Sequence, residues 1–326
     1  MNHSVKLQKI EAVNINKRFE NDVLEGLTQH PKAIPSKYFY DDAGDRLFQK
    51  ITTLGEYYLT RCEKEILHEQ VAQIAEILTD TERVRVIELG AGDGHKTIPF
   101  LKRLAELGVN VDFVPVDISE DVLQQLAKKF KEIIPEGSIH PFSADYFNVH
   151  FPEYNGTTFW MYMGSTIGNL TKDKAIGLLK NLRDSAKEGD IIGLGYDLRK
   201  DPTTILAAYN DKEGITAKFN LNLLSRINRE LGANFNLADW KHYPIYDVIT
   251  GEAKSYLLSQ KQQTVYFPKS EQTIQFEAWE AIHTEISKKF SSLEMNQICL
   301  QAGWKAKAVL TDKAANYALS FYEIIS

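Results

Sequence analysis

The sequence has very few cysteines. Cys62 and Cys299 are the only two in 326 residues, and they lie too far apart to predict a disulfide framework or a thiolate metal site. The eight histidines show no two-residue or four-residue spacing typical of metal ligands. We therefore expect two buried, reduced thiols, no metal and a cytoplasmic location.

The sequence also lacks an excess of basic residues and a long apolar run. Lys and Arg total 38 against 44 Asp and Glu, a net charge of -6, so no basic field is available for a nucleic acid or an anionic membrane. The longest weakly charged stretch, 155–171, is interrupted by Gly, Thr and Asn. We expect a monomer that binds a small molecule, with no nucleic-acid or membrane partner.

Strand-like and helix-like patterns alternate from Arg83 onward. Short apolar runs that end at a polar or glycine residue predict strands at 84–89, 112–117, 139–144, 158–163 and 190–197. Apolar residues spaced by three and four predict helices at 97–107, 121–134 and 174–187. This alternation predicts an α/β fold with a doubly wound parallel sheet.

The pattern changes after the fifth strand. Asp201 and Pro202 predict the start of a helix through Tyr209, and a second helix is expected at 217–231. Strand-like spacing follows at 255–267 and 273–286. Such a span is too long for a loop in a compact domain, so we interpret it as an inserted substrate-binding lobe.

The end of the chain completes the sheet. Ser291 and Glu294 predict a capping box for a helix that runs to Gln301 and ends at Gly303. Two strands are expected after it, at 305–311 and 317–325. Five alternating strands, a helix and a terminal strand pair are the order of the Rossmann-like, seven-stranded class I methyltransferase sheet, whose last strand is antiparallel.

A glycine-rich turn follows the first predicted strand. Gly90 and Gly92 have no Cβ, so a ligand can approach the backbone closely. A dinucleotide fingerprint requires glycine at the sixth position, where this chain has His95. An acid, Glu88, followed by glycines at alternate positions favours S-adenosylmethionine, a ligand without a pyrophosphate.

Further candidate cofactor contacts follow this turn and the next strands. Asp117 ends the second strand, where a carboxylate accepts hydrogen bonds from ribose hydroxyls. Asp145 and Tyr146, after the third strand, offer an acceptor for an adenine amino group and an aromatic surface. Lys96 stands at a helix start that disfavours a cation, which indicates an anion such as the methionyl carboxylate.

Seven stretches of the sequence together resemble one known family. They are Pro31-Lys32-Ala33-Ile34-Pro35-Ser36-Lys37-Tyr38-Phe39-Tyr40-Asp41, Glu56-Tyr57-Tyr58-Leu59-Thr60-Arg61, Gly164-Ser165-Thr166-Ile167-Gly168-Asn169-Leu170, Ala207-Ala208-Tyr209-Asn210-Asp211, Gly214-Ile215-Thr216-Ala217-Lys218-Phe219-Asn220, Asn228-Arg229-Glu230-Leu231-Gly232-Ala233 and Thr284-Glu285-Ile286-Ser287-Lys288-Lys289-Phe290. With these motifs the chain resembles the histidine-specific Nα-methyltransferases of ergothioneine biosynthesis, and the resemblance runs from about residue 22 to the C-terminus.

The resemblance implies three successive methyl transfers from S-adenosylmethionine to the α-amino group of L-histidine, giving the betaine hercynine. It implies a methyltransferase core at 63–199 and 290–326 and a substrate-binding lobe at 1–62 and 200–289. The implied substrate contacts are Tyr40, Tyr57, Asn169, Tyr209, Glu285 and Ser287, of which Tyr40 and Asn169 are the catalytic candidates. The implied cofactor contacts are Gly90, Lys96, Asp117, Asp145, Tyr146 and Gly164, beside Gly92 from the turn itself.

The chemistry of the implied substrate residues can be stated from their types. Glu285 and Ser287 are two apart in an extended segment and are expected on one face, which His283 would share. A carboxylate beside a hydroxyl can hold both nitrogens of an imidazole. Where relatives often have a bulkier apolar residue, this chain has Ser255, which predicts a wider pocket.

Two other functions remain open at this point. One is N-methylation of another amino acid, such as a tryptophan derivative, although the retained Glu285 argues against it. The other is a non-catalytic cofactor-binding relative, although the retained Asn169 and Tyr209 argue against that. We expect Tyr40, Asn169, Tyr209 and Glu285 to converge on one cavity.

Overall fold

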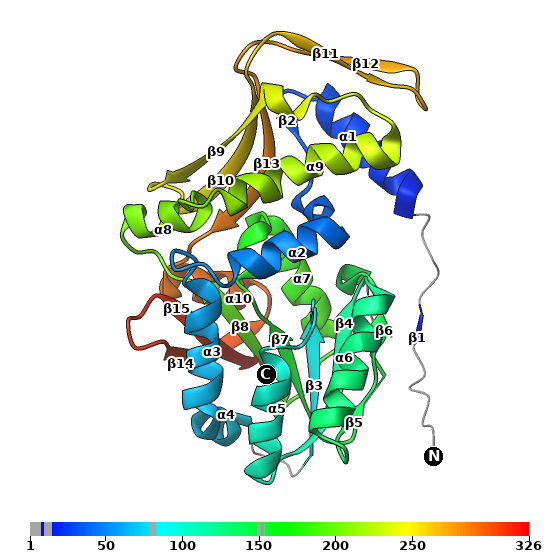
Figure 1. Ribbon diagram of the computed structural model, residues 1–326. Coiled ribbons are helices and arrows are strands. Elements are labelled where there is room, and N and C mark those ends of the chain that lie inside the picture. The colour runs from blue at the N-terminus through cyan, green and yellow to red at the C-terminus, as the bar shows by residue number, and fades with distance from the viewer. Residues whose placement is uncertain (1–7, 10–14, 79–82, 149–150, 153, 326) are drawn as a thin grey trace. The chain divides into compact units, whose positions relative to one another are not determined.

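The structure is a computed structural model that describes residues 8–9, 15–78, 83–148, 151–152 and 154–325. It divides into two compact units (Figure 1). We call Met1–Glu11, Leu59–Arg199 and Phe290–Ser326 the core unit, and Ala12–Tyr58 and Lys200–Lys289 the second unit.

The core unit is built on one large sheet in the strand order β1-β6-β4-β3-β7-β8-β15-β14, with β5 paired to β4. Its strands are β1 (Gln8–Lys9), β3 (Arg83–Leu89), β4 (Asn110–Asp117), β5 (Ser138–Ile139), β6 (Phe142–Ser143), β7 (Thr157–Tyr162), β8 (Ile191–Asp197), β14 (Trp304–Thr311) and β15 (Tyr317–Ile324). The strands from β6 to β8 pair in parallel, whereas β15 pairs antiparallel with both β8 and β14. The predicted methyltransferase sheet, including its antiparallel last strand, is confirmed.

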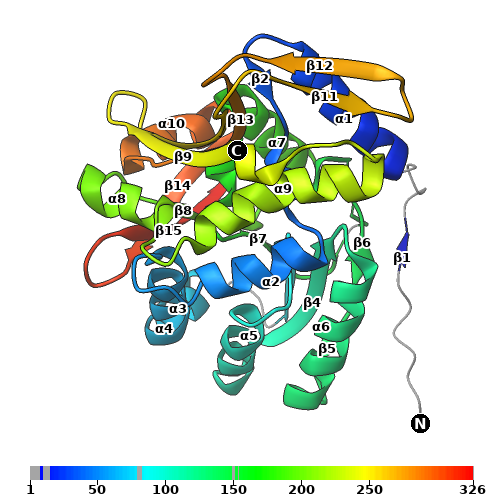
Figure 2. The ribbon, with the colours of Figure 1, turned by 45° about the horizontal axis from the view of Figure 1, so that its top comes forward.

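Helices cover both faces of this sheet, as Figures 1 and 2 show. The helices are α3 (Leu59–Glu69), α4 (Val71–Leu78), α5 (Thr97–Glu106), α6 (Glu120–Ile133), α7 (Lys172–Asp184) and α10 (Ser292–Gln301). Leu178 of α7 and Met295 of α10 share one buried cluster with alternate strand residues such as Trp160 and Tyr162. The central strands β7 and β8 are buried at every position, which explains why most of their residues are apolar.

Local signals explain where the core helices begin. The Ser119 side chain accepts from the Val122 N–H and caps α6. Ser291 and Glu294 form the predicted capping box at the start of α10, and Gly303 follows the end of that helix with φ of 86°. Each cap therefore fixes a helix boundary that the sequence predicts.

The second unit contains a four-stranded sheet in the order β2-β13-β10-β9 and a separate hairpin, β11-β12. The strands are β2 (Lys32–Ala33), β9 (Trp240–Asp247), β10 (Glu252–Ser259), β11 (Gln263–Phe267), β12 (Gln272–Phe276) and β13 (Ala281–Lys288). Each of the two predicted strand-like stretches holds parts of two strands, because each spans a turn. The sequence analysis did not predict β9.

The described residues of the second unit also form the α-helices α1 (Ile15–Thr28), α2 (Asp42–Ile51), α8 (Pro202–Tyr209) and α9 (Ile215–Leu231). Figure 2 shows α9 running along the sheet. Its Leu223 and Ile227 share a buried cluster with Leu257 of β10 and Ile282 of β13. The Asp201 side chain caps α8, as the Asp-Pro pair predicts.

The boundaries of the two units differ from the expected ones at two points. Residues 59–62 belong to the core unit, because they are the first turn of α3. The described strand β1 (Gln8–Lys9) also belongs to the core unit, where it pairs in parallel with β6. Both stretches had been expected in the substrate-binding lobe.

Candidate active site

The glycine turn lies between β3 and α5 in the core unit. Gly90 and Gly92 have φ of 73° and 54°, in the left-handed region that favours glycine. No atom of the described residues lies within 4 Å of where a Cβ would stand on either of them. Gly94 differs, because its Cβ would meet Ile98 and Leu126 at 3.1 Å. The first two glycines therefore leave open space for a ligand, whereas the third allows helix packing.

Asp117 connects this turn to the end of β4. Its Oδ2 accepts from the Gly92 N–H at 3.1 Å and its Oδ1 from the Ser119 N–H at 3.1 Å. Burial raises the pKa of Asp117. A carboxylate has about four lone-pair sites, so both oxygens can accept further hydrogen bonds. Asp117 thus orders the turn and retains the capacity to accept hydrogen bonds from ribose hydroxyls.

Asp145 and Tyr146 follow β6, the neighbour of β4, at the same edge of the sheet. Asp145 Oδ1 accepts from the Phe147 N–H at 3.2 Å. The Tyr146 hydroxyl lies 3.3 Å from the Tyr162 hydroxyl. Carboxyl ends of parallel strands form the ligand-binding edge of such sheets, so these residues and Asp117 lie on the expected side.

Lys96 forms an ion pair with Glu63 of α3, a residue that the sequence analysis did not select. Glu63 is 1% exposed and also accepts from the Gly164 N–H at 2.6 Å and from the Tyr317 hydroxyl. Burial alone would raise the pKa of Glu63, but Lys96 and these donors hold it below its usual value. Glu63 therefore connects two predicted cofactor contacts, Lys96 and Gly164.

Glu88, the acid before the turn, is almost fully buried. Its Oε1 accepts from the Thr97 hydroxyl at 2.6 Å, while its Oε2 has no hydrogen-bond partner among the described residues. Burial raises the pKa of Glu88 to about 8. A cation bound beside this buried carboxyl would favour its ionised form, and S-adenosylmethionine carries a sulfonium and an ammonium. The open glycines and this acid together fit that cofactor.

Asn169 ends the 3₁₀ helix Thr166–Asn169, which follows β7 in the core unit. Ser165, just before this helix, has φ of 58° and its Oγ accepts from the Asp197 N–H at 3.0 Å. The Ser165 N–H donates to the Tyr317 hydroxyl at 2.9 Å. A network that includes Glu63 therefore orders the segment that carries Asn169.

In the second unit, Glu285, Ser287 and Tyr209 belong to one polar cluster. The Ser255 hydroxyl donates to Glu285 Oε2 at 3.3 Å. Lys289, which was not predicted, donates to the Tyr209 hydroxyl at 2.6 Å and to Ser287 Oγ at 2.9 Å. Burial raises the pKa of Glu285 to about 7, while the Lys289 charge acts in the opposite direction.

A β-bulge at Thr284 determines which way Glu285 points. Ser255 pairs with Glu285, but the next residue, Tyr256, pairs with His283, so Thr284 is the extra residue. The expectation that His283 shares the face of Glu285 is wrong, because the bulge reverses the alternation. His283 instead lies beside Tyr256, with ring centroids 5.3 Å apart.

The bulge is fixed by a buried hydrogen bond. Thr284 Oγ1 donates to Asn220 Oδ1 of α9 at 2.9 Å, and it lies 3.0 Å from the Ser255 carbonyl oxygen. Beyond the bulge the alternation resumes, and Ser287 pairs with Ala253, two residues from Ser255. The expected common face of Glu285 and Ser287 is therefore confirmed.

Tyr40 and Tyr57 belong to a second, aromatic cluster in the same unit. The Tyr40 ring lies 5.6 Å from Phe48 and 5.8 Å from Phe219, and Phe48 lies 6.3 Å from Tyr57. The Tyr40 carbonyl accepts from Arg226 of α9 at 3.1 Å, which holds the backbone at that position. Phe48 and Phe219 were not predicted, although Phe219 lies in a stretch that carries the family resemblance.

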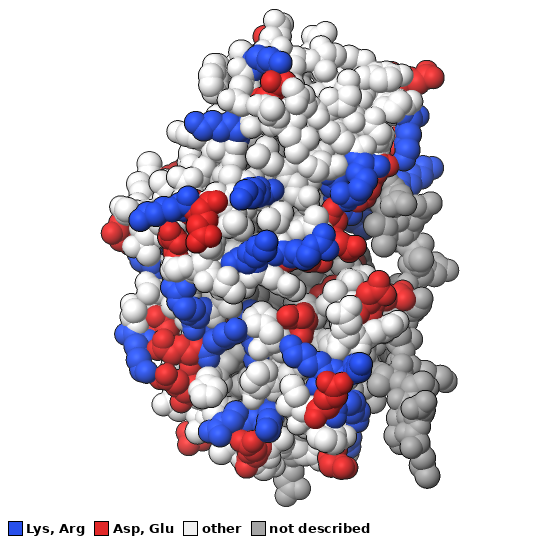
Figure 3. Space-filling view, viewed as in Figure 1, with Lys and Arg blue, Asp and Glu red and all other residues white. Residues whose placement is uncertain are grey.

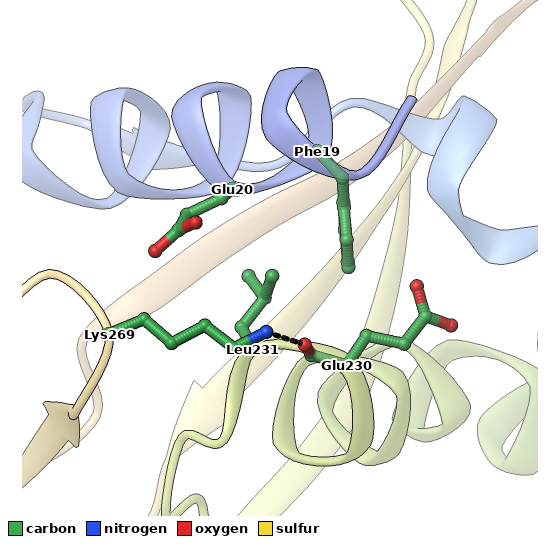
Figure 4. A pocket seen from close by; sticks show the side chains of 5 residues that line it. All are labelled: Phe19, Glu20, Glu230, Leu231 and Lys269. Carbon is green, nitrogen blue, oxygen red and sulfur yellow. Dashed lines mark hydrogen bonds between the residues drawn. The ribbon is translucent and has the colours of Figure 1, made fainter. Parts of the chain in front are cut away.

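A cavity in the second unit is separate from these two clusters. This cavity of about 480 Å³ is lined by Phe19, Glu20, Glu230, Leu231 and Lys269 (Figure 4). Lys269 donates there to the Glu230 carbonyl at 2.6 Å. None of the predicted site residues lines this cavity. The cavity therefore gives no support to the expected convergence of Tyr40, Asn169, Tyr209 and Glu285. That convergence stays a prediction.

The described surface carries charges of both signs (Figure 3). Lys and Arg are interspersed with Asp and Glu over the face visible in Figure 3. Within the described ranges, no helix is long and apolar enough to cross a membrane. The same residues contain no group of three or more His, Cys, Asp or Glu side chains that could hold a metal ion.

Comparison with solved structures identifies the class. A structure described as an S-adenosylmethionine-dependent methyltransferase from Clostridium acetobutylicum aligns with a TM-score of 0.50 at 10% identity, covering 86% of this chain and 99% of that one. The sheet order and this alignment define the fold of the S-adenosylmethionine-dependent methyltransferases.

Sequence comparison identifies the family. The family described as "Histidine-specific methyltransferase, SAM-dependent" matches residues 19–324. Histidine N-alpha-methyltransferases from Mycobacterium tuberculosis and Mycolicibacterium smegmatis are 35% and 34% identical over 92% of this chain and 92% of each relative. This chain belongs to the histidine-specific, S-adenosylmethionine-dependent methyltransferases, as the resemblance implied.

Proposed function

We propose that this enzyme transfers three methyl groups, one after another, from S-adenosylmethionine to the α-amino group of L-histidine and so forms hercynine, as in ergothioneine biosynthesis. The family match and the two mycobacterial relatives support this activity. The observation that carries it is the polar cluster of the second unit, in which Glu285 and Ser287 share one face of β13.

The core unit is proposed to hold the cofactor. Bound S-adenosylmethionine supplies an electrophilic methyl group on a sulfonium. Gly90 and Gly92 allow close approach to the backbone, and Asp117 accepts from the ribose hydroxyls. Asp145 and Tyr146 contact the adenine. Lys96 and Gly164, both held by Glu63, contact the methionyl part.

The side chain of the substrate is proposed to bind the polar cluster. The Glu285 carboxylate accepts from an imidazole N–H, and the Ser287 hydroxyl contacts the other ring nitrogen. Tyr209, connected to Ser287 through Lys289, contacts the substrate from the end of α8. An apolar amino acid would leave a buried carboxylate without a donor, which is costly.

The amino group is proposed to be oriented by Tyr40 and Asn169. Methyl transfer is an in-line displacement, so the protein must align an amine that has lost its proton. The Tyr40 hydroxyl orients the lone pair or relays the proton through water, and Asn169 both donates and accepts. The aromatic faces near Tyr40 and Tyr57 stabilise the quaternary ammonium that forms.

One incubation distinguishes this proposal from its alternatives. The pure protein is mixed with S-adenosylmethionine and each of the twenty amino acids, and with a tryptophan derivative, and the products are identified by mass. We expect histidine to gain three methyl groups, and the other compounds to be methylated far more slowly than histidine. Methylation of a tryptophan derivative instead would support that alternative, and no product at all would support a non-catalytic relative. The monomeric state and the cytoplasmic location stay predictions.

A further inference from the structure

The family resemblance implies no site role for Lys289, yet Lys289 lies at the centre of the polar cluster. Its side chain is fully buried, and Nζ donates to two residues that are proposed to contact the substrate, Tyr209 and Ser287. The Lys289 backbone N–H donates to the Gly251 carbonyl at 2.7 Å, which fixes the chain directly after β13. The ammonium also lies 4.7 Å from the centroid of the Tyr209 ring.

These contacts determine the direction of the hydrogen bonds. An ammonium group has donors and no acceptor, so both hydroxyl oxygens must accept from it. The proton of each hydroxyl is consequently directed to an acceptor other than Lys289. Ser287 is 4% exposed, and a buried hydroxyl proton needs an acceptor.

Glu285, on the same strand face as Ser287, provides hydrogen-bond acceptors. It accepts from the Ser255 hydroxyl and, as a carboxylate, can only accept. The positive charge of Lys289 favours that ionised form against the effect of burial on its pKa. The cluster therefore has an acceptor at Glu285 and, two residues along the strand, a hydroxyl at Ser287 whose proton is directed away from Lys289 and is available to donate.

We propose that Lys289 is a positioning residue that sets this polarity, so that the cluster selects a ring with one N–H and one unprotonated nitrogen. This inference rests on the proposed function. Neutral imidazole has that pattern. An imidazolium would direct an N–H at the Ser287 proton and bring a second cation close to the Lys289 ammonium. A phenyl ring would form a hydrogen bond with neither Glu285 nor Ser287.

The test compares histidine with the two pyrrolylalanines, in each of which CH replaces one ring nitrogen. Both retain an N–H and lack the acceptor nitrogen. We expect wild-type kcat/KM to favour histidine by about tenfold, the effect of one hydrogen bond. In Lys289→Met this ratio should fall, because the Ser287 proton is no longer held in the direction of the ring. In Ser287→Ala the ratio of kcat/KM for histidine to kcat/KM for the pyrrolylalanines should fall equally. The variant that carries both substitutions should show no further decrease in this ratio.

Controls separate this effect from a general loss of structure. Lys288→Met, one residue earlier, should keep the wild-type ratio, and calorimetry should show unchanged S-adenosylmethionine affinity in Lys289→Met. An unchanged ratio in Lys289→Met would overturn the inference. Should that variant not fold, the wild-type protein still decides, because equal use of histidine and the pyrrolylalanines would show that no oriented donor meets the ring. A wild type that does not methylate histidine would refute the proposed function instead.

Discussion

Ser255 on β10 lies directly opposite Glu285 on β13, and its hydroxyl donates to Glu285 Oε2 across 3.3 Å. Ser255 is fully buried. The sequence alone suggested a small residue that widens the pocket. The pairing adds a second role, because a bulkier apolar residue at this position would leave Glu285 without this donor.

The first prediction concerns Asp117. Asp117→Ala should weaken S-adenosylmethionine binding by about 1–3 kcal/mol, the usual effect of removing a charged hydrogen-bond partner. The change also releases the Gly92 and Ser119 N–H groups. Titration calorimetry measures it, with Asp121→Ala on the exposed first turn of α6 as the matched control. Equal affinity in both variants would show that Asp117 does not hold the cofactor.

Glu63 should contribute to both stability and cofactor binding. Glu63→Ala removes the buried partner of Lys96, and breaking such a pair lowers the free energy of unfolding by about 3–5 kcal/mol. Glu63→Gln retains an acceptor for the Gly164 N–H and should bind S-adenosylmethionine better than Glu63→Ala. Glu69 lies on the same helix as Glu63 and forms an exposed ion pair with Lys313. Glu69→Ala should therefore change the free energy of unfolding little. Equal stability of the Glu63 and Glu69 variants in urea would contradict this account.

The bulge at Thr284 should be essential for the orientation of Glu285. Thr284→Val keeps the shape of the side chain but leaves Asn220 Oδ1 buried without its donor. We expect the free energy of unfolding to fall by about 1–3 kcal/mol and KM for histidine to rise. Thr273→Val on the exposed hairpin strand β12 is the control. A Thr284→Val protein with wild-type KM would show that the bulge does not depend on this hydroxyl.

The raised pKa of Glu88 predicts how stability changes with pH. The unfolded carboxyl titrates near its model value of 4.5 and the folded one near 8, so between these values the native state holds a proton that the unfolded state lacks. Stability from this group is complete below pH 4.5 and decreases as pH rises to 8, by at most about 1.4 kcal/mol per unit. Glu88→Gln should flatten the decrease in urea unfolding of the cofactor-free protein. The same slope as in the exposed Glu132→Gln control would contradict the assignment.

The sequence predicts the core unit well, because its signals are local. Apolar runs and the capping box at Ser291 each fix an element of this unit without reference to distant residues. The Asp-Pro start of α8 is an equally local signal in the second unit. The second unit is harder to predict. Its strand β9 has a mixed pattern of partly buried residues, and the bulge at Thr284 depends on Asn220, which is distant in sequence.

The same distinction applies to the site. Gly90, Gly92 and Asp117 can be selected because strand, turn and helix are adjacent in sequence. Glu63 and Lys289 were missed because a buried ion pair or a donor to two hydroxyls is visible only when separate elements meet. From the sequence alone, a charged residue in an amphipathic helix or at a strand end is expected to be exposed.

The central claim is that the Glu285 carboxylate accepts a hydrogen bond from the imidazole N–H of the substrate. Glu285→Ala should reduce kcat/KM for histidine about ten- to a hundredfold more than kcat/KM for phenylalanine, because only histidine loses a charge-assisted hydrogen bond of about 1.5–3 kcal/mol. Glu277→Ala, an exposed acid just before β13, is the matched control and should leave the ratio unchanged. S-adenosylmethionine affinity should be the same in all three proteins. The account predicts a collapse of the histidine-to-phenylalanine ratio in Glu285→Ala alone, and an equal ratio in wild type and variant would contradict it.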